Sequence, residues 1–598
     1  MRVLALAVLA ALPALVFSSC LLPSFRNVDA ASGGSAGVGV GGGNAGSSVA
    51  GAAGEGGEAG QNGAEAPVPV SDTFAVLQGA TLSVPAPGVL ENDEGSSLSV
   101  TVIDDSDSGR PAKYDASTLT IDVDGSLEFK PQKDFFGVYT VAYTVQDKDG
   151  VTATSTVKIH VQPVAATLAA VRDGIGGFVI DGAANDAIGS AVAGAGDVNH
   201  DGFDDVLIGA RKAGDNGAGR AYVVYGRAKA ANVTLEALPA KSTERAFFDF
   251  DGADGDGAGN SVAGIGDING DGFSDFAVAA STAAPSGTVY VLFGGTLSGG
   301  TALSGLPAAR GLALTGTTVP IGASIAHAGD VNGDKIPDLL VSGAFGNGHL
   351  YVVPGSKKLA TSDLDSVAGL FQIEGGAANE ALPSSFDCVG NVNDDDKAEV
   401  AAGSLASAVV LLGSATGYPT QTGKVSPNGS LDGFRYTLVK HNEPAVVAGA
   451  GNVDGDTAQR DDLLLCEELD SGPACRVVFS RPIPFELSAG WNFVGFSEIP
   501  RVAHGADLNA DGFSDLLFGD GSQVYAALGK KSGHLEVSVG GLGDTDPGFT
   551  LATEAAARVD AVVTLGDVNG DTIADYAVGV STAHGSTGSV YVVFGDKY

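Results

Sequence analysis

The chain has 598 residues, and its 71 acidic residues outnumber its 32 basic residues, which gives a formal net charge of −39 at pH 7. A polyanion of this size is repelled by nucleic-acid phosphates and by anionic lipid headgroups, so the composition argues against both as direct ligands and favours cations. The length exceeds what one hydrophobic core supports, which predicts several domains or a repeat array. The 89 glycines suit tight turns and short strands.

The first residues have the features of a bacterial export signal. Arg2 supplies a positive charge, an apolar stretch runs from Val3 to Phe17, and small residues precede Cys20. The ending "FSSC" resembles a lipobox, in which the cysteine is lipidated, although Phe17 stands where an aliphatic residue is usual. We therefore predict a signal peptide at residues 1–19, lipidation of Cys20, and an exported lipoprotein at the outer membrane or surface of a bacterium. Plain secretion is the alternative.

Two regions of different character follow the signal. Residues 20–66 are rich in Gly, Ala and Ser, and such a segment buries too little apolar surface to order itself, which predicts a disordered linker. Residues 67–163 contain short strand-like runs separated by Gly, Asp and Pro turns, which is typical of a small β-sandwich. The stretches "GVLENDEG" and "DGSLEFKPQKDFFGVYTVAYTVQDKDG" resemble the cadherin-like or Ig-like repeats of bacterial surface proteins.

From residue 168 to residue 598 the chain repeats itself about every 60 residues. The stretch "GDVNHDGFDDVLIGA" at residues 196–210 has relatives whose acidic parts begin at residues 267, 330, 391, 452, 507 and 567. Each copy is followed by an apolar strand and a second strand that ends in glycine, such as "SGTVYVLFG", and is preceded by two more strand-like pieces. Four short strands repeated at a fixed period predict the blades of a β-propeller.

The repeated stretch resembles the FG-GAP repeats of the integrin α-chain propeller. The resemblance implies an all-β fold: a seven-bladed β-propeller over residues 168–598, preceded by the small Ig-like or cadherin-like sandwich. We expect a strand from one end of the repeat region to complete the sheet at the other end, because the first repeat keeps its leading strand.

The spacing of the acidic residues indicates a calcium site in each repeat. Positions one, three, five and nine of the motif D-x-N-x-D-G-x-x-D carry side-chain oxygens, and glycine at position six permits a backbone reversal. Ca²⁺ accepts six to eight oxygens at about 2.4 Å in irregular geometry, whereas Mg²⁺ demands a near-ideal octahedron and zinc prefers Cys and His. The predicted ligands are Asp197, Asn199, Asp201, Asp205, Asp267, Asn269, Asp271, Asp275, Asp330, Asn332, Asp334, Asp338, Asn391, Asn393, Asp395, Glu399, Asn452, Asp454, Asp456, Asp462, Asp507, Asn509, Asp511, Asp515, Asp567, Asn569, Asp571 and Asp575.

The seven loops are not equal, and a metal-free turn is the alternative for any single loop, because Asp, Asn and Gly also suit turns. Lys335 and Thr572 replace the glycine of the third and seventh loops, which predicts turn strain without loss of a ligand. The fourth loop begins with Asn391, and the fifth begins with Asn452 and has two extra residues before Asp462, so both sites are expected to be weaker. The clustered carboxylates of all seven loops would repel one another without a cation.

Two of the remaining cysteines have an obvious partner. Cys466 and Cys475 flank the turn-like segment "EELDSGPA" between two apolar runs, which predicts a disulfide across a hairpin in an oxidising compartment. Cys388 has no such partner and is expected to be a small buried residue.

The pattern favours a non-enzymatic, calcium-binding surface protein whose propeller binds an extracellular protein or glycan, with membrane contact through the lipid anchor only and no nucleic-acid partner. No H-E-x-x-H or G-x-S-x-G motif occurs, and isolated histidines such as His327, His441 and His504 suit turns or strands better than catalysis. The alternative is a propeller-based enzyme or a lectin that acts on extracellular polysaccharide.

Overall fold

The computed structural model describes residues 66–77, 81–104, 118–131, 137–162 and, with interior gaps, 166–595. The predicted signal peptide, the lipidated Cys20 and the predicted linker lie outside the described residues. The chain divides between residues 161 and 162 into an Ig-like unit and a repeat unit. Among the described residues, no helix has the length and apolarity needed to span a membrane.

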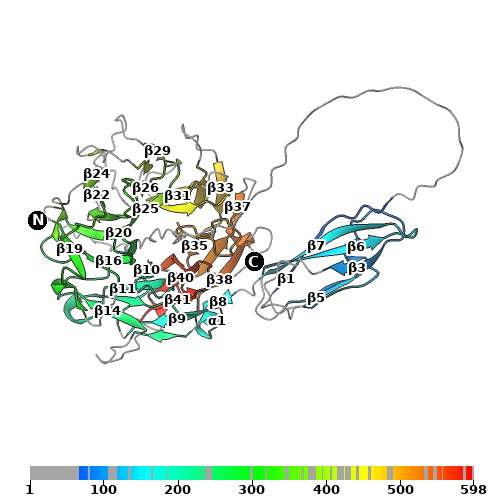
Figure 1. The fold of residues 1–598 in the computed structure, drawn as a ribbon, viewed down its shortest axis with the longest axis horizontal. Coiled ribbons are helices and arrows are strands. Elements are labelled where there is room, and N and C mark those ends of the chain that lie inside the picture. The colour runs from blue at the N-terminus through cyan, green and yellow to red at the C-terminus, as the bar shows by residue number, and fades with distance from the viewer. Residues whose placement is uncertain are drawn as a thin grey trace, which may run out of the picture. The chain divides into compact units, whose positions relative to one another are not determined.

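The Ig-like unit consists of two small sheets, with strand orders β1-β7-β6-β3 and β2-β5-β4 (Figure 1). Tyr139, Tyr143 and Val145 on the central strand β6 point to one face and are buried, as the period-two alternation of a half-buried strand requires. Its elements are β1 (Asp72–Leu77), β2 (Leu82–Val84), the 3-10 helix η1 (Gly88–Leu90), β3 (Ser99–Asp104), β4 (Thr118–Ile121), β5 (Leu127–Lys130), β6 (Gly137–Gln146) and β7 (Thr152–Gln162).

The described residues of the repeat unit form seven sheets, numbered as sheets 1–7 in the order of the acidic loops. In each sheet four strands pair antiparallel, and in all but sheet 4 a short strand from elsewhere in the chain adds in parallel at the outer edge of the described sheet. Sheets 1–4 are formed by β10 (Ala191–Gly196), β11 (Asp205–Ala210), β12 (Arg220–Val224), β14 (Phe247–Asp251) and β18 (Thr301–Ala302); β15 (Ser261–Gly266), β16 (Asp275–Ala280), β17 (Thr288–Leu292), β19 (Gly311–Thr315) and β23 (Ser362–Asp363); β20 (Ile321–Gly329), β21 (Asp338–Gly343), β22 (His349–Val353), β24 (Phe371–Glu374) and β28 (Gly423–Lys424); and β25 (Ser385–Gly390), β26 (Glu399–Gly403), β27 (Ser407–Leu411) and β29 (Gly433–Thr437).

Sheets 5–7 follow the same plan, and sheets 6 and 7 also take strands from the start of the unit. They are formed by β30 (Val446–Gly451), β31 (Asp462–Leu469), β32 (Gly472–Val478), β33 (Ala489–Val494) and β37 (Glu536–Ser538); β34 (Arg501–Val502), β35 (Leu516–Asp520), β36 (Gln523–Ala527), β38 (Gly548–Ala552) and β8 (Ala166–Thr167); and β39 (Ala561–Gly566), β40 (Asp575–Val580), β41 (Ser589–Val593), β9 (Gly177–Asp181) and β13 (Val233–Thr234). The described helices of the unit are α1 (Leu168–Arg172), η3 (Asp215–Gly217), η4 (Leu303–Gly305) and η6 (Val539–Gly541).

The two ends of the repeat unit meet in sheet 7, where β9 pairs antiparallel with β41. Arg172, just before β9, strengthens this seam: its guanidinium lies 2.8 Å from Asp181 and 3.0 Å from Glu554, and donates to the Tyr591 hydroxyl at 3.1 Å. The N-terminal strand is therefore held to the C-terminal sheet by main-chain pairing and by a charged side chain.

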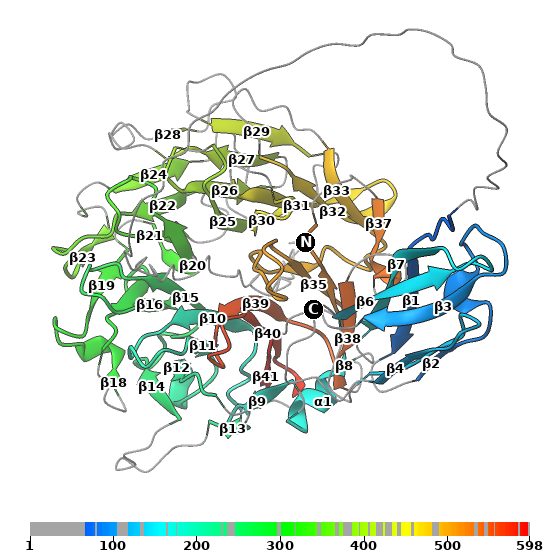
Figure 2. The same cartoon turned by 45° about the vertical axis from the view of Figure 1, so that its right-hand side comes forward.

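The first strands of neighbouring sheets lie beside one another around a common centre (Figure 2). Contacts run in sequence from β10 through β15, β20, β25, β30 and β34 to β39, and β39 also contacts β10. These strands are rich in Gly and Ala because the approach is close: a side chain at Gly264 would lie 2.1 Å from the main-chain oxygen of Gly194. The arrangement is propeller-like, and none of the described sheets closes on itself.

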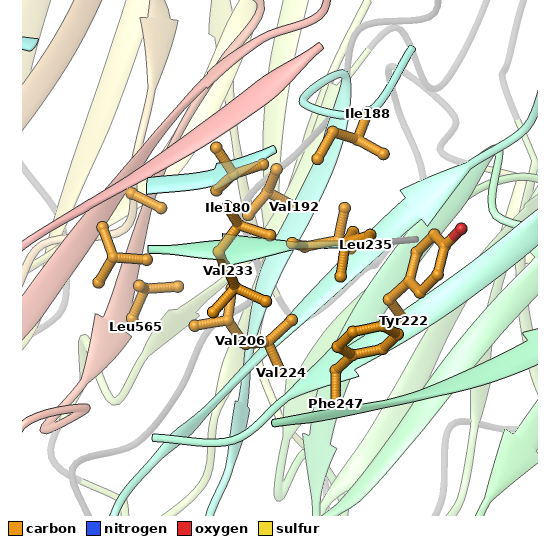
Figure 3. Packing of buried hydrophobic residues seen from close by; sticks show 14 of the residues in the cluster. Ile180, Ile188, Val192, Val206, Tyr222, Val224, Val233, Leu235, Phe247 and Leu565 are labelled. Carbon is orange, nitrogen blue, oxygen red and sulfur yellow. The ribbon is translucent and has the colours of Figure 1, made fainter. Parts of the chain in front are cut away.

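Apolar clusters fill the space between adjacent sheets. The cluster between sheets 7 and 1 brings together Ile180, Val192, Val206, Val224 and Leu565, all with at most 1% of their surface exposed (Figure 3). Because second strands such as β11 are buried on both faces, they are continuous apolar runs without polar alternation. The acidic loops end where these apolar strands begin.

Candidate metal-binding loops

Each acidic loop occupies the same place in its sheet, between the first and second strands. Loop 1 leaves β10 at Gly196, whose φ of 70° accompanies an irregularity in the β10–β11 register, and ends at Asp205, the first residue of β11. The same irregularity recurs at this point in sheets 2, 3, 4, 5 and 7. The predicted ligands therefore lie at the ends of bulged strand pairs, which re-aim side chains away from the sheet.

The first carboxylate of a loop accepts main-chain N–H groups from later residues of the same loop. In loop 1, the fifth residue Asp201 donates its N–H to Asp197 Oδ1 at 3.0 Å, and Gly202 donates to Asp197 Oδ2 at 2.9 Å. Asp201 Oδ1 in turn accepts the N–H of Phe203 at 3.1 Å. Both contacts of the first carboxylate recur at Asp267, Asp330, Asp507 and Asp567. These side-chain bonds imitate backbone turns and hold the first and fifth carboxylates within one short loop.

The backbone reverses at two positions of the loop, of which the sequence motif revealed one. At position six, Lys335 and Thr572 adopt φ values of 68° and 74°, so the strain expected from the missing glycines is present. Position four is also left-handed, with φ of 61° at His200 and 58° at Ala510. The glycines at this position in other loops were the available signal for it.

The ninth residue of each loop is a buried carboxylate that accepts two main-chain N–H groups. Asp205 is 0% exposed; its Oδ2 accepts the N–H of Val198, the second loop residue, at 3.1 Å, and its Oδ1 accepts that of Gly226, just beyond the third strand, at 2.9 Å. The same pair of bonds, from the start of the loop and from the end of the third strand, is made by Asp275, Asp338, Glu399, Asp462, Asp515 and Asp575. The ninth residue thus has a structural role that the ligand motif did not predict.

Burial makes these ninth carboxylates hard to ionise. It raises the pKa of Asp275 to about 8 and that of Asp338 to about 7, and the first and fifth carboxylates of the same loop add repulsion. Burial likewise holds the pKa values of Asp205, Asp515 and Asp575 well above the ordinary range. A cation held in the loop would favour the ionised form of all three carboxylates.

Neighbouring loops are joined by main-chain hydrogen bonds. The residue after the third strand of one sheet donates its N–H to the second residue of the preceding loop: Arg227 to Val568 at 2.8 Å, and Gly295 to Val198 at 2.7 Å. Ser356 and Lys530 make the same bond in sheets 3 and 6. Because that second residue also donates to, or lies beside, a ninth carboxylate, the carboxylates of these four loops link their own sheets to their neighbours.

The donor chemistry of the loops fits calcium. Carboxylate and amide oxygens are the side-chain donors throughout, which suits a hard cation. Among the described residues, no three His, Cys, Asp or Glu side chains converge closely enough to hold a metal ion. The first and ninth carboxylates each accept two N–H groups and keep further lone pairs, so a cage would combine the side-chain oxygens of the loop with main-chain oxygens, a mixed set that Ca²⁺ accepts.

Loops 4 and 5 depart from the others, as their sequences suggested. In loop 4 the amide of Asn391 takes the first position, accepting the N–H of Asp395 at 3.3 Å, and Asp396 has a φ of 62° at the sixth position. In loop 5 the predicted ligand Asp456 lies outside the described residues. Loop 4 has two carboxylates where the other loops have three, and loop 5 begins with an amide and has two extra residues before Asp462, so these two loops are the weaker candidates for a cation.

The three described cysteines and His327 lie outside the acidic loops. Cys466 and Cys475 form a disulfide across the β31–β32 hairpin, and Cys388 is a buried free thiol. His327, on β20, is 3% exposed and accepts the N–H of Gly329 through Nδ1 at 3.2 Å. Burial lowers the pKa of His327 to about 3, so the ring is neutral and serves as a core residue.

Comparisons with known proteins address both units. The bacterial Ig domain family matches residues 64–160, and the FG-GAP repeat family matches residues 188–224 and 258–292. No curated protein matches the chain. A crystal structure of the BP39L lectin from Burkholderia pseudomallei is similar with a TM-score of 0.37 at 13% identity, over 70% of this chain and 98% of that chain. The family matches cover the loops of sheets 1 and 2.

Proposed function

We propose that this chain, which is an FG-GAP repeat protein with an Ig-like domain, is a calcium-stabilised, non-enzymatic binding module held at the cell surface by a lipid on Cys20. The observation that carries the proposal is the seven-fold recurrence of one loop, which places oxygen donors at the same end of every sheet. A rigid ring of such loops is suited to presenting a surface to a partner, and the fold alone does not name that partner.

The seven sheets are the seven blades of a closed propeller in this proposal. Two observations support it: the first strands contact one another in sequence from β10 to β39 and back to β10, and β9 completes the last sheet. Closure of this kind removes free sheet edges and fixes the loops relative to one another.

Calcium has a structural role in the proposal. Each loop gathers carboxylates whose mutual repulsion, added to burial, opposes ionisation of the ninth residue, and a cation would relieve that repulsion. With free Ca²⁺ about tenfold above Kd, one site would stabilise the folded chain by about 1.4 kcal/mol. Five fully equipped loops would then contribute about 7 kcal/mol, which is comparable to the whole stability of a typical domain.

Terbium luminescence tests the metal part of the proposal. The chain without residues 1–19 is titrated with Tb³⁺ and then with competing Ca²⁺. We expect several sites that Ca²⁺ displaces, because trivalent lanthanides take the same hard oxygen donors. A double variant Asp267→Ala and Asp271→Ala removes two donors of loop 2 and leaves Asp275 intact, so it should lose one site only. Absence of Tb³⁺ binding would exclude calcium from the account.

The binding part is tested by immobilising the same chain and presenting extracellular proteins and a glycan array, in calcium and in EDTA. We expect capture without turnover, lost in EDTA as the loops loosen. Hydrolysis on a panel of glycosides and esters would instead favour the enzyme alternative, and capture of glycans alone would favour a lectin. Cys20→Ala should move the protein from the membrane fraction to the soluble fraction; unchanged membrane association would contradict the lipid anchor.

A further inference from the structure

Sheets 4, 5 and 6 are joined at the centre of the repeat unit by a buried acid–histidine pair. Asp387 on β25 is 2% exposed, and its Oδ2 lies 3.6 Å from Nδ1 of His504, which precedes loop 6. The same Oδ2 accepts the N–H of Gly449 on β30 at 3.0 Å. A residue of sheet 4 and a residue of sheet 6 thus meet across the first strand of sheet 5.

The space for this pair exists because residue 449 has no side chain. A Cβ at Gly449 would lie 2.2 Å from Cε1 and 2.4 Å from Nδ1 of His504. The pair is also an exception within the repeat: at the position of Asp387, four residues before each loop, the other sheets carry small apolar residues. These residues are Ala193, Ala263, Ala326, Ala448, Ala503 and Val563.

A second device, a pair of hydrogen bonds that we call the Asp461 latch, joins loops 4 and 5. Asp461, just before the ninth position of loop 5, accepts the N–H of Asn391 through Oδ2 at 2.9 Å, and its own N–H donates to the main-chain oxygen of Asn391 at 3.0 Å. The same latch is made by Asp204 to Asp567 between sheets 1 and 7.

The third device is covalent and lies within sheet 5. The hairpin of β31 and β32 pairs seven residues on each strand, from Leu463 with Val478 to Leu469 with Gly472, and the Cys466–Cys475 disulfide links one of these pairs. The hairpin is longer than that of sheet 1, which pairs five residues on each strand. A cross-link restricts the open states available to this hairpin.

The three devices lie in or between sheets 4, 5 and 6, and the loops of sheets 4 and 5 depart most from the calcium motif. Loop 4 has two carboxylates where the other loops have three, and loop 5 begins with Asn452 and has two extra residues before Asp462. We propose that sheets 4 and 5 are held by the Asp387–His504 pair, the Asp461 latch and the disulfide in place of calcium, so that they stay folded when calcium is removed. This inference rests on the proposed calcium role of the other loops.

Hydrogen exchange of the full mature chain, measured peptide by peptide in calcium and in EDTA, tests the inference. We expect exchange in β10, β15, β20 and β39 to rise about tenfold in EDTA, because an ion held at tenfold excess over its Kd shifts opening by that factor. Exchange in β25, β30 and β31 should change less than about threefold. Trp491, the only tryptophan of the chain, is buried in β33 of sheet 5. Its fluorescence emission in EDTA should stay that of a buried ring.

Two changes should abolish the difference between the sheets. Reducing the disulfide of the unaltered chain in EDTA should expose sheet 5 to exchange, whereas reduction in calcium should have less effect. The double variant Asp387→Ala and His504→Gly restores residues that other repeats carry at these positions, such as Ala193 and Gly194, so its strands remain compatible with the fold. Asp387→Asn, which keeps an oxygen for Gly449, is the matched control.

The possible outcomes separate this inference from the proposed function. If no sheet responds to EDTA, the calcium role fails and the inference fails with it. If sheets 1–3 and 7 respond and sheets 4 and 5 respond equally, the calcium role stands and the inference is overturned. If sheets 4 and 5 resist EDTA but the reduced chain and the double variant resist it equally well, the three devices are not the cause and the inference is likewise overturned.

Discussion

The Ig-like unit and the repeat unit are both built from strands, but different groups hold them together. In the Ig-like unit one apolar core surrounds Tyr143, whose hydroxyl donates to Asp72 Oδ2 at 2.7 Å and lies 2.9 Å from the main-chain oxygen of Val89. In the repeat unit the buried polar groups are carboxylates such as Asp205, which tie loops to strands once per sheet. The comparison teaches that a single-core unit depends on its core, whereas a repeated unit depends on its joints.

Chelation should separate the two units most strongly. In calorimetry of the mature chain, EDTA should lower the melting temperature of the repeat unit by on the order of 10 °C, since about five sites lose roughly 1.4 kcal/mol each. The transition of the Ig-like unit should not move, because the predicted calcium loops all lie in the repeat unit. Equal shifts of both transitions, or no shift of either, would contradict the proposed difference.

Removal of one ninth carboxylate should come next in size. Asp515→Ala leaves the buried N–H groups of Leu508 and Gly529 without their acceptor and should lower the free energy of unfolding of the repeat unit by about 3 kcal/mol. Asp515→Asn keeps one acceptor oxygen and should cost less. Denaturant melts followed by Trp491 emission measure the stability of both variants. An unchanged midpoint in Asp515→Ala would show that this carboxylate does not stabilise the contact between the loop and the strands.

The stability linked to His327 and the stability linked to Asp72 should change with pH in opposite directions. Because the pKa of His327 is lowered to about 3, the unfolded chain takes up a proton below pH 6.5 that the folded chain does not. The contribution of His327 to the stability of the repeat unit should therefore fall by about 2 kcal/mol between pH 7.5 and pH 5, measured as the difference between wild type and His327→Gln. In the Ig-like unit burial raises the pKa of Asp72 to about 6, so the stability linked to Asp72 is lost as pH rises through that value. The melting of each unit is measured across this pH range. Equal slopes of stability against pH in wild type and His327→Gln would show that His327 does not cause the dependence.

Within the Ig-like unit, Tyr143→Phe should cost about 1.5 kcal/mol. The variant loses the hydroxyl contacts to Asp72 and Val89 while keeping the ring in the core. Calorimetry should show a lower transition for this unit alone. A change in the repeat-unit transition would mean that the two units are energetically coupled, against the comparison made above.

The smallest expected effect is a gain in stability. Lys335→Gly should stabilise the repeat unit by about 0.5 kcal/mol, because the φ of 68° at this position is strained for a residue with a side chain. Thr572→Gly offers the same test in loop 7, where φ is 74°. The denaturant midpoints of both variants measure this effect. A lower stability of both variants would show that the Lys335 and Thr572 side chains stabilise the fold by more than the backbone strain costs.

The repeats, their strands and the acidic loops were predictable because their signals are local. The motif around Asp197 sets donors at alternate positions and a turn at Gly202, and the flanking apolar runs are strands whatever the rest of the chain does. The roles of Asp205 and Asp387 were not predictable, since their partners lie at Gly226 and Gly449, on other strands or other sheets. The one sequence signal for Asp387 is that it stands where the other repeats have a small apolar residue.

The all-β repeat region, the Ig-like region ahead of it and the oxygen-rich turns could be predicted from the sequence, because strand periodicity and turn chemistry act over a few neighbouring residues. Tertiary structure alone decided which strand completes the last sheet, which carboxylates are buried as joints, and that Asp387 meets His504 across Gly449. These features depend on groups that come together only when sheets pack side by side, and no local sequence pattern encodes which groups will then be in contact.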